Sequence, residues 1–366
     1  MIRTFSDRML AWYDQHARTL PWRVGPKQKQ TGTKPDPYYV WLSEIMLQQT
    51  TVATVKPYFR KFLSIWPTVH TLANANINDI MREWAGLGYY SRARNLYSAA
   101  RQVQDQYGGA FPSTESALRK LAGVGEYTAA AIAAIAYDQR AVVVDGNVNR
   151  VIVRHENLRQ PVADIKPLIR THAEARTPAQ QPGDYAQAIM DLGAMICTPT
   201  KPKCLLCPVH EDCKALAHGD PDALPAKKQV PRKPVRRGVV KVMLSTDGMV
   251  LVKTNPNRGL LGGMVMFPHS AWIDVAEAAG NAKTVFSDWD HFVGDNPIEG
   301  LAMGGEPMGQ VHHTFTHFHL ILWVVKVEPV ERMVKSNQFF WHPIKQIDDL
   351  ALPTLMKKVW QCAMLD

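Results

Sequence analysis

Four of the five cysteines fall within one short segment, and this is the clearest chemical signal in the sequence. The spacing from Cys197 through Cys204 and Cys207 to Cys213 is C-x6-C-x2-C-x5-C. Thiolates at this density hold zinc or an iron–sulfur cluster, and structural zinc sites usually pair two short C-x2-C motifs. The single close pair therefore favours a cluster of four irons and four sulfides. The fifth cysteine, Cys362, is expected to be an inert thiol.

One glutamate stands in a setting that suits proton transfer. Glu44 lies in VWLSEIMLQQT, a segment with helical spacing of apolar residues. A carboxyl group lodged against apolar neighbours has a raised pKa and donates a proton near neutral pH. This segment alone is equally compatible with a solvated helix face. Gln48 follows one helical turn later on the same face.

A glycine-containing turn and an aspartate follow further along the chain. Residues 121–129, LAGVGEYTA, predict a hairpin in which Gly123 and Gly125 allow backbone N–H groups to cradle a phosphate. A plain connection between two helices is the alternative. In AVVVDGNVNRV, Asp145 is expected to cap the helix at 146–154. A carboxylate fixed there would stabilise the positive charge that builds on a deoxyribose when its base leaves.

The pattern of apolar residues divides the chain into two regions and a linker. Helical spacing continues to about residue 195, so we expect an all-α region over 1–213 that ends in the cysteine loop 197–213. The basic, Pro-rich residues 214–236 predict a linker. Residues 237–366 predict an α+β domain with a hairpin at Asp247-Gly248, a strand over 320–327 and a short helix in DDLALPTLMKKVW. Residues 24–37 are expected to form an exposed loop.

The composition indicates a globular protein with a polyanionic partner. The chain has 366 residues, 46% hydrophobic and 20% charged, with a formal net charge of +9. No apolar run is long enough for a membrane span, and the N-terminus has no signal-peptide core. We therefore expect a cytoplasmic protein without a membrane partner, associated with the nucleoid if bacterial. In that compartment clustered cysteines bind metal rather than form disulfides.

Taken together, these motifs resemble the MutY-type adenine DNA glycosylases of the endonuclease III superfamily. The resemblance covers nearly the whole chain through LPW at 20–22, SEIMLQQT at 43–50, GLGYYSRARNL at 86–96, the hairpin, VDGNVNRV at 144–151, the cysteine loop and HTFTH at 313–317. It implies an all-α helix–hairpin–helix core with a [4Fe-4S] cluster, followed by a Nudix-like (MutT-like) α+β domain. It also implies a monomer that acts on double-stranded DNA containing A:8-oxoguanine or A:G mispairs.

The resemblance implies roles for individual residues. The adenine is flipped out of the duplex, Glu44 protonates its N7 and Asp145 stabilises the oxocarbenium-like sugar, with Tyr127 and Asn147 in support. The implied substrate-binding residues are Arg18, Leu20, Trp22, Gln187 and Gln48 around the adenine, Gln49, Leu87 and Tyr89 beside the opposite base, and Phe315, Thr316 and His317 in the loop that detects 8-oxoguanine. Core packing for Leu20 and Trp22 and a polar helix surface for Gln187 are the alternatives.

At several positions this sequence differs from the motifs of related enzymes, and these differences exclude some of their reactions. Tyr127 stands where the bifunctional pyrimidine enzymes carry a lysine, so no Schiff base can form from that position and we expect a monofunctional enzyme. Thr316 replaces the family's serine. PHSAWIDVAEAAG lacks the acidic box of a catalytic Nudix domain, so nucleotide hydrolysis is expected to be lost. The alternating His313, His317 and His319 could share a strand face, with a zinc site as the minor interpretation.

Two other functions compete with adenine excision. The first is a pyrimidine-mismatch glycosylase on the same scaffold, against which the recognition domain and Tyr127 argue. The second is a non-catalytic iron–sulfur DNA-binding protein, against which the presence of both Glu44 and Asp145 argues.

Overall fold

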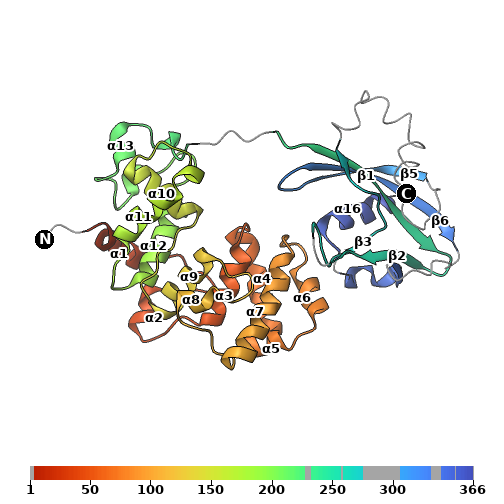
Figure 1. Cartoon of the computed structure of the whole chain (residues 1–366), viewed down its shortest axis with the longest axis horizontal. Coiled ribbons are helices and arrows are strands. Elements are labelled where there is room, and N and C mark those ends of the chain that lie inside the picture. The colour runs from red at the N-terminus through yellow and green to blue at the C-terminus, as the bar shows by residue number, and fades with distance from the viewer. Residues whose placement is uncertain are drawn as a thin grey trace. The chain divides into compact units, whose positions relative to one another are not determined.

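The computed structural model describes residues 4–226, 232–256, 259–274, 306–330, 339–350 and 352–365. The chain forms two compact units, one of Met1–Ala75 with Arg94–Gln229 and one of Asn76–Ala93 with Val230–Asp366. Figure 1 shows that the first is built from helices and that the second contains the β-sheet. Among the described residues, no helix combines the length and the apolar character needed to cross a bilayer.

Helices and short connections make up the whole described part of the first unit, as the spacing of apolar residues predicts. Its α-helices are α1 (Phe5–His16), α2 (Pro26–Gln30), α3 (Pro37–Leu47), α4 (Val52–Ile65), α5 (Val69–Ala73), most of α7 (Ser91–Tyr107), α8 (Glu115–Leu118), α9 (Glu126–Tyr137), α10 (Gly146–Glu156), α11 (Lys166–Arg176), α12 (Pro182–Met195) and α13 (Lys214–His218).

Small residues let the central helices of this unit approach closely. Helix α9 is rich in alanine and is buried from Thr128 to Ile135, and it packs against both α3 and α12. Gly183 stands at the crossing of α12 with α9, where an added Cβ would lie 2.3 Å from the carbonyl oxygen of Ala134. This close contact fixes the distance between the helices that carry the predicted site residues.

Replacing Gly183 by alanine should therefore destabilise the helical unit. The new methyl group meets backbone that cannot rotate away, so we expect the free energy of unfolding to fall by about 1–3 kcal/mol in chemical denaturation. Gly25→Ala is the matched control, because the nearest atom to its added Cβ is 3.9 Å away. Equal effects of the two substitutions would contradict this account of the crossing.

The segment 24–37 is mostly exposed, but the expectation of a loop throughout is wrong. Residues 26–30 form the short helix α2, because Pro26 suits the first position of a helix. Lys29 of this helix forms an ion pair with Asp184 of α12 at 2.7 Å.

The second unit contains helix α6 (Ile77–Trp84) and a seven-stranded sheet of mixed direction. The strands follow the order β3-β2-β1-β6-β5, in which β1 and β6 are parallel, and β4 and β7 pair with β1 and β2. Helix α16 packs against β5, β6 and β1 over the apolar core. The strands are β1 (Val235–Ser245), β2 (Met249–Thr254), β3 (Val265–Met266), β4 (Ile273–Asp274), β5 (Glu306–Thr314), β6 (His319–Val330) and β7 (Phe339–Pro343), and α16 is Thr354–Ala363.

Three sequence expectations for this unit can be compared with the structure. The hairpin at Asp247-Gly248 is confirmed as β1–β2, with Gly248 at φ +79°, and the strand at 320–327 lies within β6. The predicted terminal helix begins only at Thr354, because Pro353 cannot lie inside a helix. The shared strand face for the three histidines is wrong, since His313 is on β5, His319 is on β6 and His317 lies in the turn between them.

Candidate active site

A cavity of about 870 Å³ opens in the helical unit, and the predicted catalytic residues meet there. Its walls come from the segment before α2, from α3 and the turn that follows it, and from the starts of α9 and α10 together with α12. A volume of this size is typical of small-molecule pockets. Ten of the residues predicted for catalysis or substrate binding line it: Arg18, Leu20, Trp22, Glu44, Gln48, Gln49, Tyr127, Asp145, Asn147 and Gln187.

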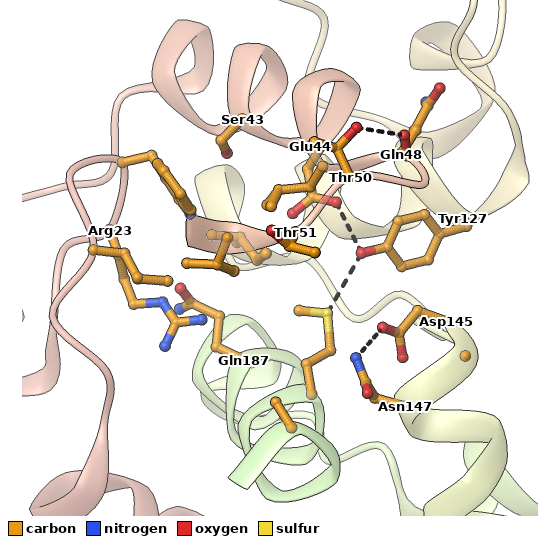
Figure 2. Close-up of a pocket in the computed structure, with 18 of the residues that line it drawn as sticks. Arg23, Ser43, Glu44, Gln48, Thr50, Thr51, Tyr127, Asp145, Asn147 and Gln187 are labelled. Carbon is orange, nitrogen blue, oxygen red and sulfur yellow. Dashed lines mark hydrogen bonds between the residues drawn. The ribbon is translucent and has the colours of Figure 1, made fainter. Parts of the chain in front are cut away.

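Glu44 is held inside this cavity by a helix that is buried on nearly all sides. Helix α3 begins at Pro37 after the capping carboxylate of Asp36, and its residues from Val40 to Met46 are buried. Glu44 is 7% exposed, and the Tyr127 hydroxyl donates a hydrogen bond to its Oε2 at 2.8 Å (Figure 2). The interpretation of a solvated helix face is therefore wrong for Glu44.

Burial makes Glu44 a weak acid. Desolvation raises its pKa from 4.5 to about 7, and the charge of Asp145 acts in the same direction. The hydrogen bond from Tyr127 and the charge of Arg23 lower the pKa but do not offset desolvation. Tyr127 remains a neutral donor, because burial raises the pKa of its hydroxyl well above the usual value. The cavity thus holds a carboxyl group that can carry a proton near neutral pH.

Asp145 is fixed at the start of α10, as the sequence predicts. Its Oδ1 accepts a hydrogen bond from the Val148 backbone N–H at 2.7 Å, and its Oδ2 accepts one from Asn147 Nδ2 at 2.8 Å. Burial raises the pKa of Asp145, while these two hydrogen bonds act against the rise by stabilising the anion. Figure 2 shows Asp145 and Glu44 at the wall of one pocket, with the Tyr127 hydroxyl between them.

A buried arginine connects Asn147, the hydrogen-bond partner of Asp145, to the cysteine loop. Arg150 of α10 donates from Nη2 to Asn147 Oδ1 at 2.9 Å and from Nε to the carbonyl oxygen of Cys197 at 2.7 Å. One turn later, Arg154 donates to the Thr198 carbonyl at 2.7 Å and approaches Cys197 Sγ at 3.4 Å. One face of α10 therefore positions both the catalytic candidates and the first cysteine.

Arg150→Gln should weaken catalysis and stability together. The shorter amide cannot reach all of these acceptors, so we expect a loss of about 2–3 kcal/mol of stability. A displaced Asn147 would lower the rate of base release about 10–100-fold. The control is Arg159→Gln, which removes only a half-exposed ion pair with Asp220 and should change neither quantity appreciably. Single-turnover rates and denaturation curves for both variants check the prediction, and an unchanged rate for Arg150→Gln would contradict it.

Two further residues of the cavity region were not predicted from the sequence. Arg23 lines the cavity, and Asp191 of α12 pairs with both Arg18 and Arg23 while being 0% exposed. The signal that could have revealed Asp191 is a lone carboxylate in the apolar helix QAIMDLGAMI, the same kind of pattern that pointed to Glu44.

The predicted phosphate-binding turn has the expected backbone. Gly123 has φ +74°, and an added Cβ would lie 2.7 Å from the Cβ of Asn95, so a side chain is excluded there. Gly125 is the N-cap residue of α9 and makes no side-chain cap hydrogen bond. Within the turn, the backbone N–H groups of Ala122 and Val124 already donate to Gln102 Oε1 and to the Leu121 carbonyl. The N–H groups at the start of α9, which have no partner within the helix, are therefore the ones expected to meet an anion.

The residues predicted to lie beside the opposite base have unusual backbone geometry. Gln49 and Tyr89 have φ values of +58° and +46°. Residues other than glycine rarely adopt this left-handed backbone conformation, and such residues cluster at functional sites. Gln49 belongs to the helical unit and is exposed, whereas Leu87 and Tyr89 belong to the second unit. Leu87 is 4% exposed, and Tyr89 is 46% exposed.

The predicted 8-oxoguanine loop is the turn between β5 and β6. Phe315 packs in an aromatic cluster with Phe318 and Trp272, at ring-centroid distances of 4.9 and 5.7 Å. Thr316 and His317 are exposed at the tip of the turn, and the Thr316 hydroxyl lies 3.1 Å from that of Tyr89 in the same unit. The turn thus presents a hydroxyl and an imidazole on a rigid apolar base.

None of the four clustered cysteines forms a disulfide, and each is partly buried. Burial raises the pKa of Cys204, Cys207 and Cys213, that of Cys207 to about 12, and the charge of Cys197 raises each of them further. The four thiols therefore lie within electrostatic reach of one another. Over the described residues, no three His, Cys, Asp or Glu side chains form a ready-made site for a single metal ion.

Comparison with known proteins identifies the class to which this fold and site belong. Residues 42–169 match the HhH-GPD superfamily of base excision DNA repair proteins, and residues 239–362 match the NUDIX domain. The structure of a thermostable thymine-DNA glycosylase superposes with a TM-score of 0.51 at 32% identity, covering 58% of this chain and 95% of that one. The protein is thus a helix–hairpin–helix DNA glycosylase with an added Nudix-like domain.

Relatives that match nearly the whole chain define the family. The adenine DNA glycosylase of Rattus norvegicus is 34% identical over 98% of this chain and 78% of its own length. The adenine DNA glycosylases of Homo sapiens (33% identical, 98% of this chain, 74% of that protein) and Buchnera aphidicola subsp. Schizaphis graminum (31%, 98% of each) match similarly. The chain belongs to the adenine DNA glycosylase family, whose members hydrolyse N-glycosidic bonds in base excision repair.

Proposed function

We propose that this enzyme removes adenine mispaired with 8-oxoguanine or guanine in double-stranded DNA and leaves an abasic site. The observation that carries the proposal is the meeting of Glu44 and Asp145 in one cavity, with Tyr127 between them. Enzymes that cleave glycosidic bonds commonly use two carboxyl groups in different protonation states. The surroundings of Glu44 and Asp145 favour that division of roles.

In this proposal Glu44 is the general acid. With a pKa of about 7, a large fraction of Glu44 is protonated at neutral pH. Transfer of this proton to N7 of a flipped adenine converts the base into a neutral leaving group. Tyr127 donates to Oε2 and so leaves Oε1 to carry the proton toward the base.

Asp145 is the electrostatic partner of the sugar. Two hydrogen bonds, from Val148 and Asn147, stabilise its anion inside a buried site. An anion held there opposes the positive charge that develops on C1′ and the ring oxygen as the base departs. Among the residues that line the described cavity the cations are Arg18 and Arg23, with no lysine, which supports monofunctional hydrolysis without a Schiff base.

Two buried donors in the cavity suit an adenine ring. In the described part of the chain, Gln187 Nε2 and Arg23 Nε are buried without a hydrogen-bond partner. Such donors are costly unless a ligand supplies acceptors, and adenine offers ring nitrogens for this purpose. Leu20 and Trp22 add apolar surface to the same cavity.

Recognition of the opposite base is proposed for the turn of Phe315, Thr316 and His317 together with Gln49 and Tyr89. The support is the exposed hydroxyl and imidazole of the turn and the left-handed backbone of Gln49 and Tyr89. Residues 268–280, which lack the acidic Nudix box, lie partly outside the described residues, so the loss of nucleotide hydrolysis stays a prediction.

The four clustered cysteines are the proposed ligands of a [4Fe-4S] cluster. Four thiols in mutual electrostatic reach, with Arg154 at Cys197, suit an anionic cluster better than isolated structural cysteines. When bound, the cluster would supply structural bracing of its loop. The hydrogen bonds of Arg150 and Arg154 connect that loop to α10, and Arg150 also holds Asn147.

Removal of the cluster should therefore abolish base release by loosening α10. We expect Cys204→Ser to lower the iron content and the visible absorbance of the purified protein and to lower the thermal midpoint of unfolding. Cys362→Ser, which alters a thiol outside the cluster segment, should leave about four irons per chain, the content that a cubane requires. Full iron content in Cys204→Ser would contradict the assignment.

The proposed specificity is tested with duplexes that differ only in the base opposite adenine. Single-turnover release of adenine should be fastest opposite 8-oxoguanine, slower opposite guanine and slowest opposite thymine. Thr316→Ala should reduce the preference for 8-oxoguanine and spare the rate opposite guanine. Release of thymine from T:G, without release of adenine, would instead support the pyrimidine-mismatch alternative.

A further inference from the structure

A buried aspartate on α12 holds two arginines at the wall of the adenine cavity. Asp191 Oδ1 accepts a hydrogen bond from Arg18 Nε at 2.6 Å, and Oδ2 accepts one from Arg23 Nη1 at 2.6 Å. The side chains of Asp191 and Arg23 are 0% and 6% exposed. Water therefore cannot replace either partner, and the carboxylate sets where the Arg23 guanidinium lies.

Arg18, Arg23 and Asp191 together carry one net positive charge, and the two arginines lie in the same cavity wall as Glu44. Arg18 and Arg23 line the cavity, whereas Asp191 does not. The carboxyl groups that line the cavity are Glu44 and Asp145. Arg23 is close enough to Glu44 to act on it electrostatically. Glu44 is thus an alternative partner for Arg23 if Asp191 is removed.

Among the other groups that face Glu44, Asp145 opposes Arg23 by raising the pKa of Glu44, but Asp145 is fixed in place, so Arg23 is the charge whose displacement would change this balance. Tyr127 of α9 donates a hydrogen bond and stays neutral, and Asp145 at the start of α10 is occupied by Asn147 and Val148. The start of α4 and helix α12 contribute only uncharged residues to the cavity wall: Thr51, Val52, Gln187, Met190 and Ala194. The charge state of Glu44 therefore depends on where Arg23 is held.

We propose that Asp191 is a positioning residue for adenine excision, because it keeps Arg23 on the α12 side of the cavity and prevents a permanent Arg23–Glu44 ion pair. Glu44 then remains able to carry the proton that the departing base needs. This inference rests on the proposed role of Glu44 as the general acid. A carboxyl group paired with an arginine ionises at lower pH and is a poorer acid catalyst at neutral pH.

The test is the pH dependence of single-turnover adenine release by the full-length protein between pH 5.5 and 9. Protonated Glu44 is required, so the wild-type rate should fall as pH rises through about 7. In Asp191→Asn this alkaline limb should move down by about one to two pH units. The rate at pH 8 then falls about tenfold or more, whereas the rate at pH 5.5 falls by no more than about fourfold. A rate lowered by the same factor at every pH would overturn the inference.

Substitutions of Arg23 distinguish an electrostatic effect of Asp191→Asn from a general structural one. Asp191→Asn combined with Arg23→Gln should return the alkaline limb toward its wild-type position. Arg23→Gln alone keeps the Asp191–Arg18 pair and removes a cation near Glu44, so its limb should move to higher pH. Should Asp191→Asn fail to fold, an unchanged or lowered limb in Arg23→Gln would still overturn the inference.

The two levels of the proposal fail in distinguishable ways. A wild-type profile without any alkaline limb would contradict the general-acid role of Glu44 and with it this inference. If the wild type shows an alkaline limb and Asp191→Asn does not shift it, the positioning role of Asp191 is contradicted, whereas the general-acid role of Glu44 is not. A change in DNA affinity, measured by fluorescence anisotropy at each pH, is excluded as the cause when the enzyme is saturating.

Discussion

Replacing Asp145 by asparagine is expected to lower the single-turnover rate of adenine release by at least about 10³-fold, because it removes the charge that stabilises the sugar cation. The fold should survive, since asparagine caps a helix as well as aspartate and can keep the hydrogen bond from Val148. Affinity for the mispaired duplex should be unchanged or slightly higher, because one negative charge near the DNA is lost.

A matched substitution exists at the start of another helix. Asp36 caps α3 by accepting a hydrogen bond from the Tyr38 N–H at 2.8 Å, yet it does not line the cavity. Asp36→Asn should keep nearly the full rate. Comparable losses in both variants would mean that capping, rather than charge, explains Asp145. Retention of activity in Asp145→Asn would contradict the role of its charge, and DNA binding without any adenine release by the wild type would support a binding-only protein.

Glu44→Gln should lower the rate about 10²–10⁴-fold and abolish the alkaline limb of the pH profile, because the amide cannot donate the proton that Glu44 carries. The measurement is again single-turnover release across pH. Glu126→Gln is the control, because this exposed carboxylate at the start of α9 pairs with Arg170 and not with the cavity residues. A Glu44→Gln variant that kept the wild-type limb would place the titrating group elsewhere.

The same substitution should change stability in a pH-dependent way. Folding raises the pKa of Glu44 from 4.5 to about 7, so its contribution to stability is fully present below pH 4.5 and is lost as pH rises through 7. Above pH 8 the ionised, buried Glu44 costs about 3 kcal/mol, which glutamine avoids. Denaturation at pH 5 should show little difference between the variant and the wild type, and at pH 8.5 the variant should be more stable. A difference independent of pH would contradict the burial argument.

Much of the fold follows from short-range patterns in the sequence. The apolar spacing predicts a helical region, Asp145 before a helical stretch predicts its cap, and Asp247-Gly248 predicts the hairpin between β1 and β2. These features depend on neighbours within a few residues. The errors at 24–37 and before Pro353 concern where an element begins, which depends on a single proline position in each case.

The site was harder to predict because its contacts cross long stretches of sequence. The environment of Glu44 could not be decided from α3 alone, since Tyr127 approaches it from 83 residues away. Arg23 and Asp191 are 168 residues apart, and the link from Arg150 to Cys197 spans 47. No local sequence motif predicts pairs that are so far apart in the chain. The domain limits 1–213, 214–236 and 237–366, the monomeric state and the cytoplasmic location stay predictions.

The most direct test of the central claim is chromatography of the small molecules released when the wild-type enzyme is incubated with a duplex containing adenine opposite 8-oxoguanine. The account predicts stoichiometric free adenine and an intact strand that breaks at that position only after alkali. Absence of free adenine, or strand breakage without alkali, would contradict it.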